Sequence, residues 1–497
     1  MIASIIIAFS SSAATPPSKS QGANTPDAIY RLIRHSYTLN QDGTMDYNYR
    51  KEVAILRNRA LTAYAWMGET FITYNPAFET LKINECYTLQ KDGTKVETPK
   101  AGFIEQLPSN STDCGRYNGI RELAIVHTGM EIGCTVVLDY TIHRNSDKIF
   151  ANFTLAEDCP VDRYEVILQN TGKAKLEWGE NCVTKKDFTC ENLGTRCVWI
   201  ATNLPQKYSD PYLPADSQLY NSIYIHSGHR CNWFVFNNDE MLPDAKMLIA
   251  TLGETDRVAH AINIANYVVN NVATNDIAPE LLNFVISPAA TTWQSNCGTP
   301  SDKTQLLGAL LREGGYNATA LVEHGTMSVK LTVEGKEYKL SAIKKNELSD
   351  EKAMPVEETT PTAKPLDWRK KDLGKGYTEW TMPQPKMGFD ARYLTDSRKA
   401  PLNLKKTETT EAIYNLTQTK GKMTTKPYDI RMNSKTKTKD GKPLWTMHIK
   451  LQQTDTTINA TRSFVINDDY LISGKEYKAF REALIKWQSS TTLIVTE

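Results

Sequence analysis

A single cysteine stands directly ahead of an apolar helical segment in the stretch NCGTPSDKTQLLGALLREGG. A thiolate near the positive end of a helix is a good nucleophile, and a histidine can accept its proton. Cys297 supplies the sulfur, and His324 lies between a predicted strand and a predicted hairpin, from which it could face the helix start. Cys297 and His324 are therefore one candidate pair for cysteine-dependent acyl transfer or proteolysis.

The residues after the cysteine also have a structural explanation. Thr299 suits an N-cap, Pro300 suits the first helical position because its fixed φ fits a helix, and Asp302 completes a box-like start. The helix then presents two leucine pairs and stops at Gly314-Gly315. On this interpretation Cys297 is a bystander thiol, with a cysteine of the N-terminal region as one candidate partner.

Helix and strand signals surround this start and predict a small α+β unit over residues 246–345. Upstream, one face of a predicted helix carries Val258, Ile262, Ala265, Val268 and Val272. Downstream, ATALV and the hairpin SVKLTVEGKEYKLS, which turns at Glu334-Gly335, read as antiparallel strands.

Both flanking regions predict β structure. Over residues 26–245, Asp42-Gly43 and Asp92-Gly93 mark hairpins, and GMEIGCTVVLDYTIH reads as a β-branched strand, which favours an antiparallel β-sandwich-like domain. Residues 346–365 are rich in proline and acidic side chains and read as a linker. Residues 366–497 predict a C-terminal β-sandwich-like domain, so the expected fold class is a three-domain α+β protein.

The chain ends in one predicted helix. Ser473 and Glu476 resemble a capping box, and Tyr477, Phe480, Leu484 and Trp487 form an apolar stripe. We interpret this stripe as core packing rather than as a binding face.

Composition argues against several classes of function. The 497 residues carry a net charge of +1, so no basic excess favours nucleic acid as a partner. Glycine-rich phosphate loops are absent from the sequence, and we expect no cofactor. His226, His229 and Cys231 lie close together but lack a fourth ligand at zinc spacing, so we predict no metal site.

The first residues and the cysteines both favour export. Residues 1–25 contain a short apolar run, Ile2 to Phe9, followed by a small-residue site typical of signal peptide cleavage, and no segment predicts a membrane span. Eight of the nine cysteines lie before residue 232, an even number that fits a disulfide framework, with eight free thiols as the alternative. We expect a periplasmic or extracellular location.

The segment after Cys297 resembles bacterial transglutaminase-like proteins of a type found in Bacteroides-like bacteria. Their pattern Gly-Asp-Cys-Lys-Asp-Lys, followed by leucine pairs, Arg, Gly and Ala, compares with Asp302-Lys303, Arg312, Gly315 and Ala318. FITYNPAFETLKINECYTLQKDG resembles their N-terminal β-rich domain of unknown function, and ATRSFVINDDYLISGKEYKAFREALIKW resembles the end of their C-terminal β domain. The resemblance implies a small papain-like core between two β domains.

The same resemblance implies that the catalytic triad is degenerate. Counting back from Asp302-Lys303 places the nucleophile position at Pro300, three residues after Cys297. The histidine position falls on Ser328, with Met327 as the alternative, and the aspartate position falls on Ser341. A site without thiolate, imidazole and carboxylate cannot perform the family's acyl transfer.

Three hypotheses of function follow. The first is a non-catalytic, transglutaminase-like pseudoenzyme of the cell envelope, which binds or assembles an unidentified envelope protein, peptide or glycan. The second is a cysteine-dependent acyl-transferase or protease that uses Cys297 and His324. The third is a carbohydrate-binding protein that acts through its β domains.

Overall fold

The structure of the chain is a computed structural model that describes residues 25–62, 69–111, 113–183, 188–227, 235–253, 256–323, 326–347, 364–365, 369–381, 388–417, 422–423, 427–454, 457–489 and 492–496. The signal-like segment predicted for residues 1–25 lies outside the described residues except for its last member. Residues 348–363 of the predicted linker also lie outside them.

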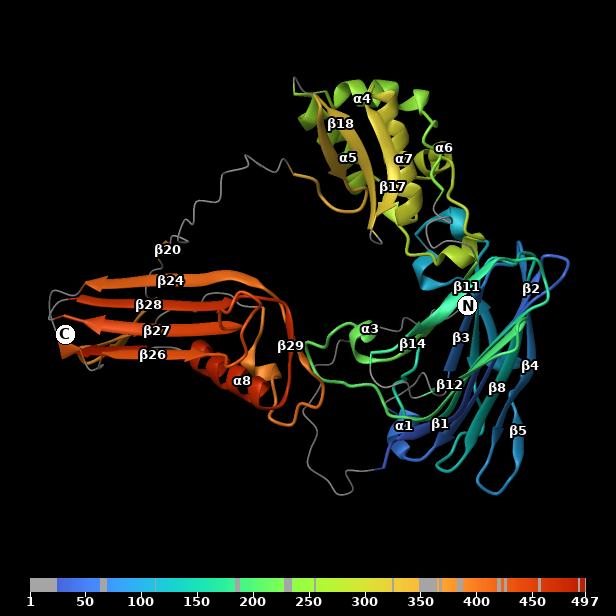
Figure 1. Cartoon of the computed structure of the whole chain (residues 1–497), viewed down its shortest axis with the longest axis horizontal. Helices are drawn as coiled ribbons and strands as arrows, with labels where there is room; N and C mark the ends of the chain where they lie inside the picture. Colours follow the sequence, from blue (N-terminus) through green and yellow to red (C-terminus); the bar gives the residue numbers. More distant parts are fainter. Residues whose placement is uncertain are drawn as a thin grey trace, which may run out of the picture.

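The chain forms three bodies in sequence order, and most of its regular structure is β (Figure 1). Among the described residues, strands account for 44% and helices for 21%, and the strands form many small sheets, so the expected α+β class is wrong. The helical periodicity was strong locally, but it occupies short stretches between much longer runs of alternating residues. We therefore describe the protein as a β-rich multidomain protein.

The N-terminal body is built on an eight-stranded sheet with the order β12-β13-β10-β1-β2-β8-β4-β5. Its strands are β1 (Ala28–Leu39), β2 (Met45–Ile55), β4 (Glu79–Leu89), β5 (Lys95–Glu97), β8 (Thr135–Arg144), β10 (Val161–Asn170), β12 (Phe188–Asn192) and β13 (Arg196–Leu204). The hairpins predicted at Asp42-Gly43 and Asp92-Gly93 are confirmed, and both glycines adopt positive φ. One pair, β1 with β10, is parallel, so the sheet is mixed rather than purely antiparallel.

Two three-stranded sheets complete the N-terminal body, in the orders β11-β14-β9 and β3-β7-β6. Their strands are β3 (Glu69–Tyr74), β6 (Phe103–Gln106), β7 (Arg121–Val126), β9 (Phe150–Thr154), β11 (Leu176–Asn181) and β14 (Ser222–Ser227). Two short helices, α1 (Asn58–Thr62) and α3 (Asp216–Leu219), lie at the edges. Ile33, Val166 and Trp199 are among the buried residues of the main core between the sheets.

The middle body combines four helices with a three-stranded antiparallel sheet, β17-β18-β19. Its elements are α4 (Lys246–Thr251), α5 (Arg257–Asn271), α6 (Ala289–Ser295), α7 (Pro300–Glu313), β17 (Asn317–Glu323), β18 (Thr326–Val333) and β19 (Lys336–Leu340). A further parallel pair joins β15 (Ala273–Thr274) to β16 (Cys297–Gly298). The papain-like core expected here is not shown: the middle body has four helices, one three-stranded sheet and one two-stranded pair.

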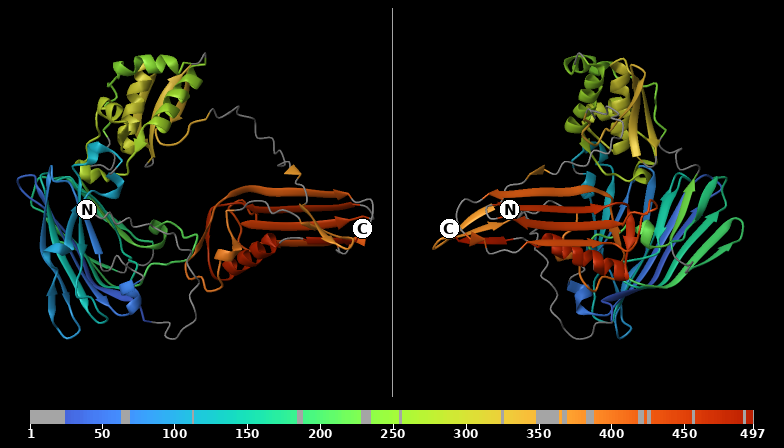
Figure 2. Two further views of the ribbon diagram at one scale, coloured as in Figure 1. Left: turned by 180° about the vertical axis from the view of Figure 1, so that it is seen from behind. Right: turned by 60° about the vertical axis from the view of Figure 1, so that its left-hand side comes forward.

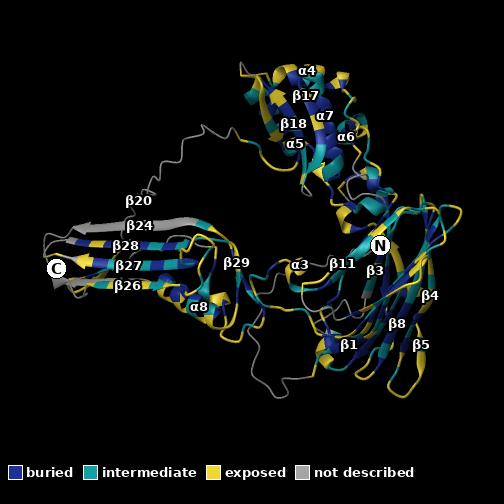
Figure 3. Cartoon of the chain, in the orientation of Figure 1, coloured by how far each residue is buried: buried dark blue, intermediate teal, exposed yellow. Residues whose placement is uncertain are grey.

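Helix α7 is the centre of the middle body. Leu306, Leu307, Leu310 and Leu311 are all fully buried, as the leucine pairs predicted. They pack against Ile262, Ala265 and Val268 of α5 and against the inner face of the small sheet. Residues 302–311 are all buried, so α7 is covered on every side, and Figure 3 shows the helix in the colour of buried residues over most of its length.

The C-terminal body contains a five-stranded sheet, β20-β24-β28-β27-β26, and a four-stranded sheet, β21-β22-β30-β25. Its strands are β20 (Lys364–Pro365), β21 (Arg369–Gly374), β22 (Tyr377–Thr381), β23 (Leu402–Leu404), β24 (Thr407–Thr417), β25 (Lys422–Met423), β26 (Tyr428–Asn433), β27 (Trp445–Gln453), β28 (Thr457–Ile466), β29 (Tyr470–Ile472) and β30 (Thr492–Thr496). Helix α8 (Gly474–Gln488) packs on this body.

The predicted stripe of α8 is confirmed as core, but its predicted capping box is not formed. Phe480, Leu484 and Trp487 are fully buried. The Ser473 side chain makes no cap hydrogen bond. The Glu476 carboxylate instead accepts the indole N–H of Trp445, with a donor–acceptor distance of 3.1 Å, so a tertiary partner has replaced the local one.

Loops of the N-terminal body touch both other bodies, which lie at different places around it (Figure 2). The Tyr212 ring packs on Phe389 at 5.3 Å between ring centroids, and Arg398 donates to the Tyr212 carbonyl oxygen. The contact with the middle body surrounds the start of α7.

Candidate functional site

The start of α7 has the predicted local geometry. The Thr299 hydroxyl accepts the Asp302 N–H, and the Asp302 carboxylate accepts the Thr299 N–H, which together make a capping box with Pro300 in the first turn. Pro300 therefore occupies a position in which a missing N–H costs the helix no hydrogen bond. Lys303 is buried and donates to the Val272 carbonyl at 2.7 Å, and burial lowers its pKa.

The three positions that the transglutaminase resemblance assigned to the triad line one groove. Pro300, Ser328 and Ser341 all contribute to a cavity of about 620 Å³, which we call the Pro300 groove. Strand register explains the meeting, because Val329 pairs with Leu340 and so brings Ser328 and Ser341 to the same end of the β18–β19 pair. That end lies beside the first residue of α7.

The Pro300 groove offers little of the chemistry that acyl transfer needs. The Ser341 hydroxyl oxygen accepts the backbone N–H groups of Ile343 and Lys344, so it is engaged in a local turn. Glu323 and Lys339 form an ion pair at the rim. No cysteine or histidine is among the described residues that line the groove, so the cysteine–histidine pair of the transglutaminase mechanism is not found among them.

Cys297 lies in a different environment from the one that catalysis requires. Its sulfur forms a disulfide with Cys114, and the Cys297 side chain is only 4% exposed. A sulfur atom in a disulfide cannot ionise to a thiolate, so Cys297 cannot act as a nucleophile while this bond is intact. His324, the other half of the alternative pair, lies outside the described residues.

This disulfide corrects the expected cysteine framework. Cys86, Cys134, Cys159 and Cys197 are buried free thiols rather than framework disulfides, and burial raises the pKa of each, to about 11 for Cys159. The bond that does form connects two bodies, and not two strands of one β domain.

Sequence reasoning missed the contacts that surround the disulfide. Arg116 and Tyr117 follow Cys114 and reach the carboxylate of Asp302, with donor–acceptor distances of 2.8 and 3.0 Å. The Ser287 N–H donates to the same carboxylate at 2.7 Å. We call this set the Asp302 junction. Spacing gave no signal for it, since Arg116 and Asp302 lie 186 residues apart.

Electrostatics at the Asp302 junction favour the ionised carboxylate. Burial alone would raise the pKa of Asp302, but the Ser287 N–H, the Arg116 guanidinium and the Thr299 donors together hold it below the ordinary value. A fully buried, ionised carboxylate with several donors acts as a structural anchor between the two bodies.

The remaining candidates give no metal or membrane site within the described residues. His226 is buried and stacks on Phe150, whereas His229 and Cys231 lie outside the described part of the chain. Across the described ranges, no group of three or more His, Cys, Asp and Glu side chains is placed to hold a metal ion. None of the described helices is long and apolar enough to cross a bilayer.

These observations define the class, a β-rich multidomain protein in which a disulfide and a buried ion pair join the first two bodies. Comparison with known families adds one match: a domain of unknown function with a solved structure, DUF3857, covers residues 41–207 of the N-terminal body. No curated protein matches the sequence. The family match leaves the transglutaminase resemblance of residues 246–345 a prediction.

Among solved structures, the chain is similar to a candidate protease from Parabacteroides distasonis. The two share 22% sequence identity with a TM-score of 0.74, over 95% of this chain and 99% of the other. At that identity the likeness shows a common fold across all three bodies and leaves activity open. An M1 zinc metallopeptidase from Deinococcus radiodurans also matches, but its 8% identity and TM-score of 0.19 carry no argument.

Proposed function

We propose that the protein is a non-catalytic, transglutaminase-like component of the cell envelope that acts by binding. The observation that carries this proposal is the composition of the Pro300 groove. Pro300, Ser328 and Ser341 lie at three separate places along the chain, and none supplies the thiolate, imidazole or carboxylate that the family mechanism uses. Three independent losses at one place favour a scaffold over an enzyme.

The disulfide bond of Cys297 supports the same proposal. A catalytic cysteine must be reduced and reachable, yet this sulfur is buried in a bond to Cys114. A disulfide between bodies also supports export, because such bonds persist in oxidising compartments. The buried free thiols are compatible with that location, since a buried thiol is poorly accessible to oxidants.

Two activity assays on the full chain test the proposal. Wild-type protein is incubated with a fluorogenic peptide library, and separately with a fluorescent amine and a glutamine-bearing protein acceptor. The matched control is the Cys114→Ser/Cys297→Ser variant, which removes the sulfur and its partner together. We expect no product above this control. Product formed by wild type and lost in the folded double variant would overturn the proposal and assign the nucleophile to Cys297 or Cys114.

A gain-of-chemistry variant tests the assigned triad positions. We expect the new thiol of the Pro300→Cys/Ser328→His/Ser341→Asp variant to titrate well below about 8.5, the ordinary cysteine value. The Pro300→Cys variant alone controls for the helix end. Rates of iodoacetamide labelling against pH report both pKa values, and identical profiles would contradict the assignment of Ser328 and Ser341.

A further inference from the structure

A second cavity lies between strands of the N-terminal body and residues 276–281. Its volume is about 530 Å³, within the range of small-molecule sites. Two contacts hold the roof in place: the Asn75 side chain donates to the Leu281 carbonyl, and the Asn110 side chain donates to the Asp276 carbonyl, both at 2.7 Å. We call it the tyrosine cavity.

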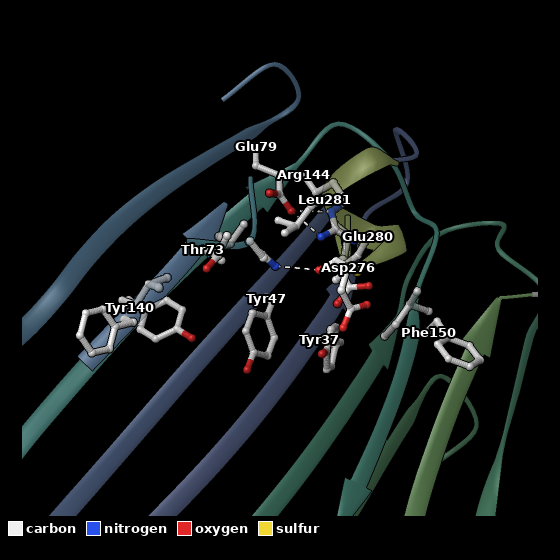
Figure 4. A pocket seen from close by; sticks show the side chains of 17 residues that line it. Tyr37, Tyr47, Thr73, Glu79, Tyr140, Arg144, Phe150, Asp276, Glu280 and Leu281 are labelled. Atoms are coloured by element: carbon white, nitrogen blue, oxygen red, sulfur yellow. Dashed lines mark hydrogen bonds and ion pairs between the residues drawn. The ribbon is translucent and has the colours of Figure 1, made fainter. Parts of the chain in front are cut away.

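Aromatic rings form the floor of the tyrosine cavity. Tyr37, Tyr47 and Tyr140 come from the neighbouring strands β1, β2 and β8, and Figure 4 shows them in a row beneath the roof. Ring centroids lie 4.7 Å apart for Tyr37 and Tyr47, and 6.2 Å apart for Tyr47 and Tyr140. The Tyr37 hydroxyl has no hydrogen-bond partner among the described residues, which leaves a donor for a ligand.

The charged groups of the lining fall into two kinds. Arg144 donates to the buried Glu79 carboxylate through Nε at 2.9 Å, so this cation is already neutralised within the wall. Asp276 and Glu280 differ, because neither carboxylate has a hydrogen bond or ion pair with any described residue. Both carboxylates come from the roof, above the Tyr37 ring (Figure 4). The cavity thus combines aromatic faces below with two uncompensated negative charges above.

We infer that the tyrosine cavity binds a glycan that carries a free, protonated amino group. Pyranose C–H faces pack on aromatic rings, and an ammonium group is attracted both to ring faces and to carboxylates. A lone alkylammonium side chain would fill a small part of 530 Å³. An anionic ligand would meet two unpaired carboxylates and only one cation, which Glu79 already holds. The inference rests on the proposed binding function and adds to it a site and a ligand class.

Isothermal calorimetry on the full chain near pH 6.5 and at low salt tests this inference. The probes are a fully deacetylated glucosamine trimer, its N-acetylated counterpart, and a short lysine peptide. We expect the amine trimer to bind at least about tenfold more tightly than the acetylated trimer or the peptide, because only it offers both a cation and sugar faces.

Variants connect the binding to the cavity. Glu280→Gln and Asp276→Asn should each weaken binding of the amine trimer by about tenfold, since each removes one charge and little volume. Glu97→Gln, which neutralises an exposed carboxylate on β5, is the matched control and should leave the affinity unchanged. Unchanged thermal unfolding of all three variants verifies that each is folded.

Several results of these binding experiments would contradict the inference. No binding of the amine trimer, equal binding of the acetylated trimer, tighter binding of the lysine peptide, or full affinity in Glu280→Gln would overturn the inference. These outcomes differ from failure of the proposed function, which would show as acyl transfer or peptide cleavage that depends on Cys297.

Discussion

At the scale of single residues, the side chains around the start of α7 have structural contacts. Pro300 occupies the position that the resemblance gives to a nucleophile, and Cys297 is joined to Cys114. Asp302 accepts hydrogen bonds from Ser287, Tyr117 and Thr299 while paired with Arg116. Side chains near the expected site therefore stabilise the contact between two bodies.

The Asp302→Asn substitution should lower the free energy of unfolding by about 3 kcal/mol, because it leaves the largely buried Arg116 without its anion. The pKa of Asp302 is lower in the folded state than in the unfolded state. Its stabilising contribution is therefore present above the ordinary carboxyl range and is lost as pH falls through the folded-state pKa. Urea unfolding at several pH values measures both effects.

Asp429→Asn is the control for this prediction, since Asp429 forms an exposed ion pair with Arg431 and its pKa is also lowered by that partner. We expect its unfolding midpoint to match wild type near neutral pH. An Asp302→Asn variant as stable as wild type at pH 7 would show that the Asp302 junction contributes nothing to the fold.

At the scale of elements, the two predicted capping boxes have different outcomes. Thr299 caps α7 through a formed box, whereas Ser473 makes no cap hydrogen bond because Glu476 binds Trp445 instead. Both helix starts have a hydroxyl residue followed three positions later by an acidic residue, which is the capping-box pattern. The difference arises because Trp445 lies next to α8 only after the C-terminal strands have paired.

Thr299→Ala should therefore destabilise the protein by about 1 kcal/mol, the usual contribution of a cap side chain. Ser473→Ala should change the unfolding free energy by less than about 0.5 kcal/mol. Paired thermal melts of the two variants check this difference. Equal losses would mean that the cap geometry does not determine helix stability here.

Residues 276–286 form an element that faces two cavities. Glu280 and Leu281 line the tyrosine cavity, whereas Ile277, Pro279 and Leu282 line an apolar pocket of about 180 Å³ next to Pro300. One short segment thus contributes to the lining of the inferred glycan site and to that of the pocket beside Pro300.

At the scale of the whole molecule, the Cys114–Cys297 disulfide links bodies whose cysteines are 183 residues apart. Such a link restricts the unfolded chain strongly, because the loop it closes is long. The Cys114→Ser/Cys297→Ser variant should lose about 2–5 kcal/mol of stability. Denaturant unfolding of wild type with and without reductant measures the same contribution of the disulfide to the free energy of unfolding. Wild type in reductant should match the variant, and unequal midpoints would assign the loss to the serine side chains.

The sequence by itself determined the local features. Turn residues located the hairpins at Asp42-Gly43 and Asp92-Gly93, and leucine spacing located α7 with its cap at Thr299. These features depend on backbone preferences and on contacts within a few residues, which a single sequence records. The sequence-based prediction of an α+β fold was wrong about the proportions of helix and strand. A strong helical periodicity in one segment does not show what fraction of the chain is helical.

Only the tertiary structure decided the features on which the proposed function and the inferred site depend. The disulfide partner of Cys297, the contact of Arg116 with Asp302, and the cavity beneath Glu280 all join residues more than a hundred positions apart. The tyrosines flanking the Asp42-Gly43 turn were a visible signal, since Tyr37 pairs with Tyr47 across the hairpin. Their role depends on the roof that the middle body brings over them. Strand order and docking between bodies set such distances, and neither is encoded in the local periodicity of the chain.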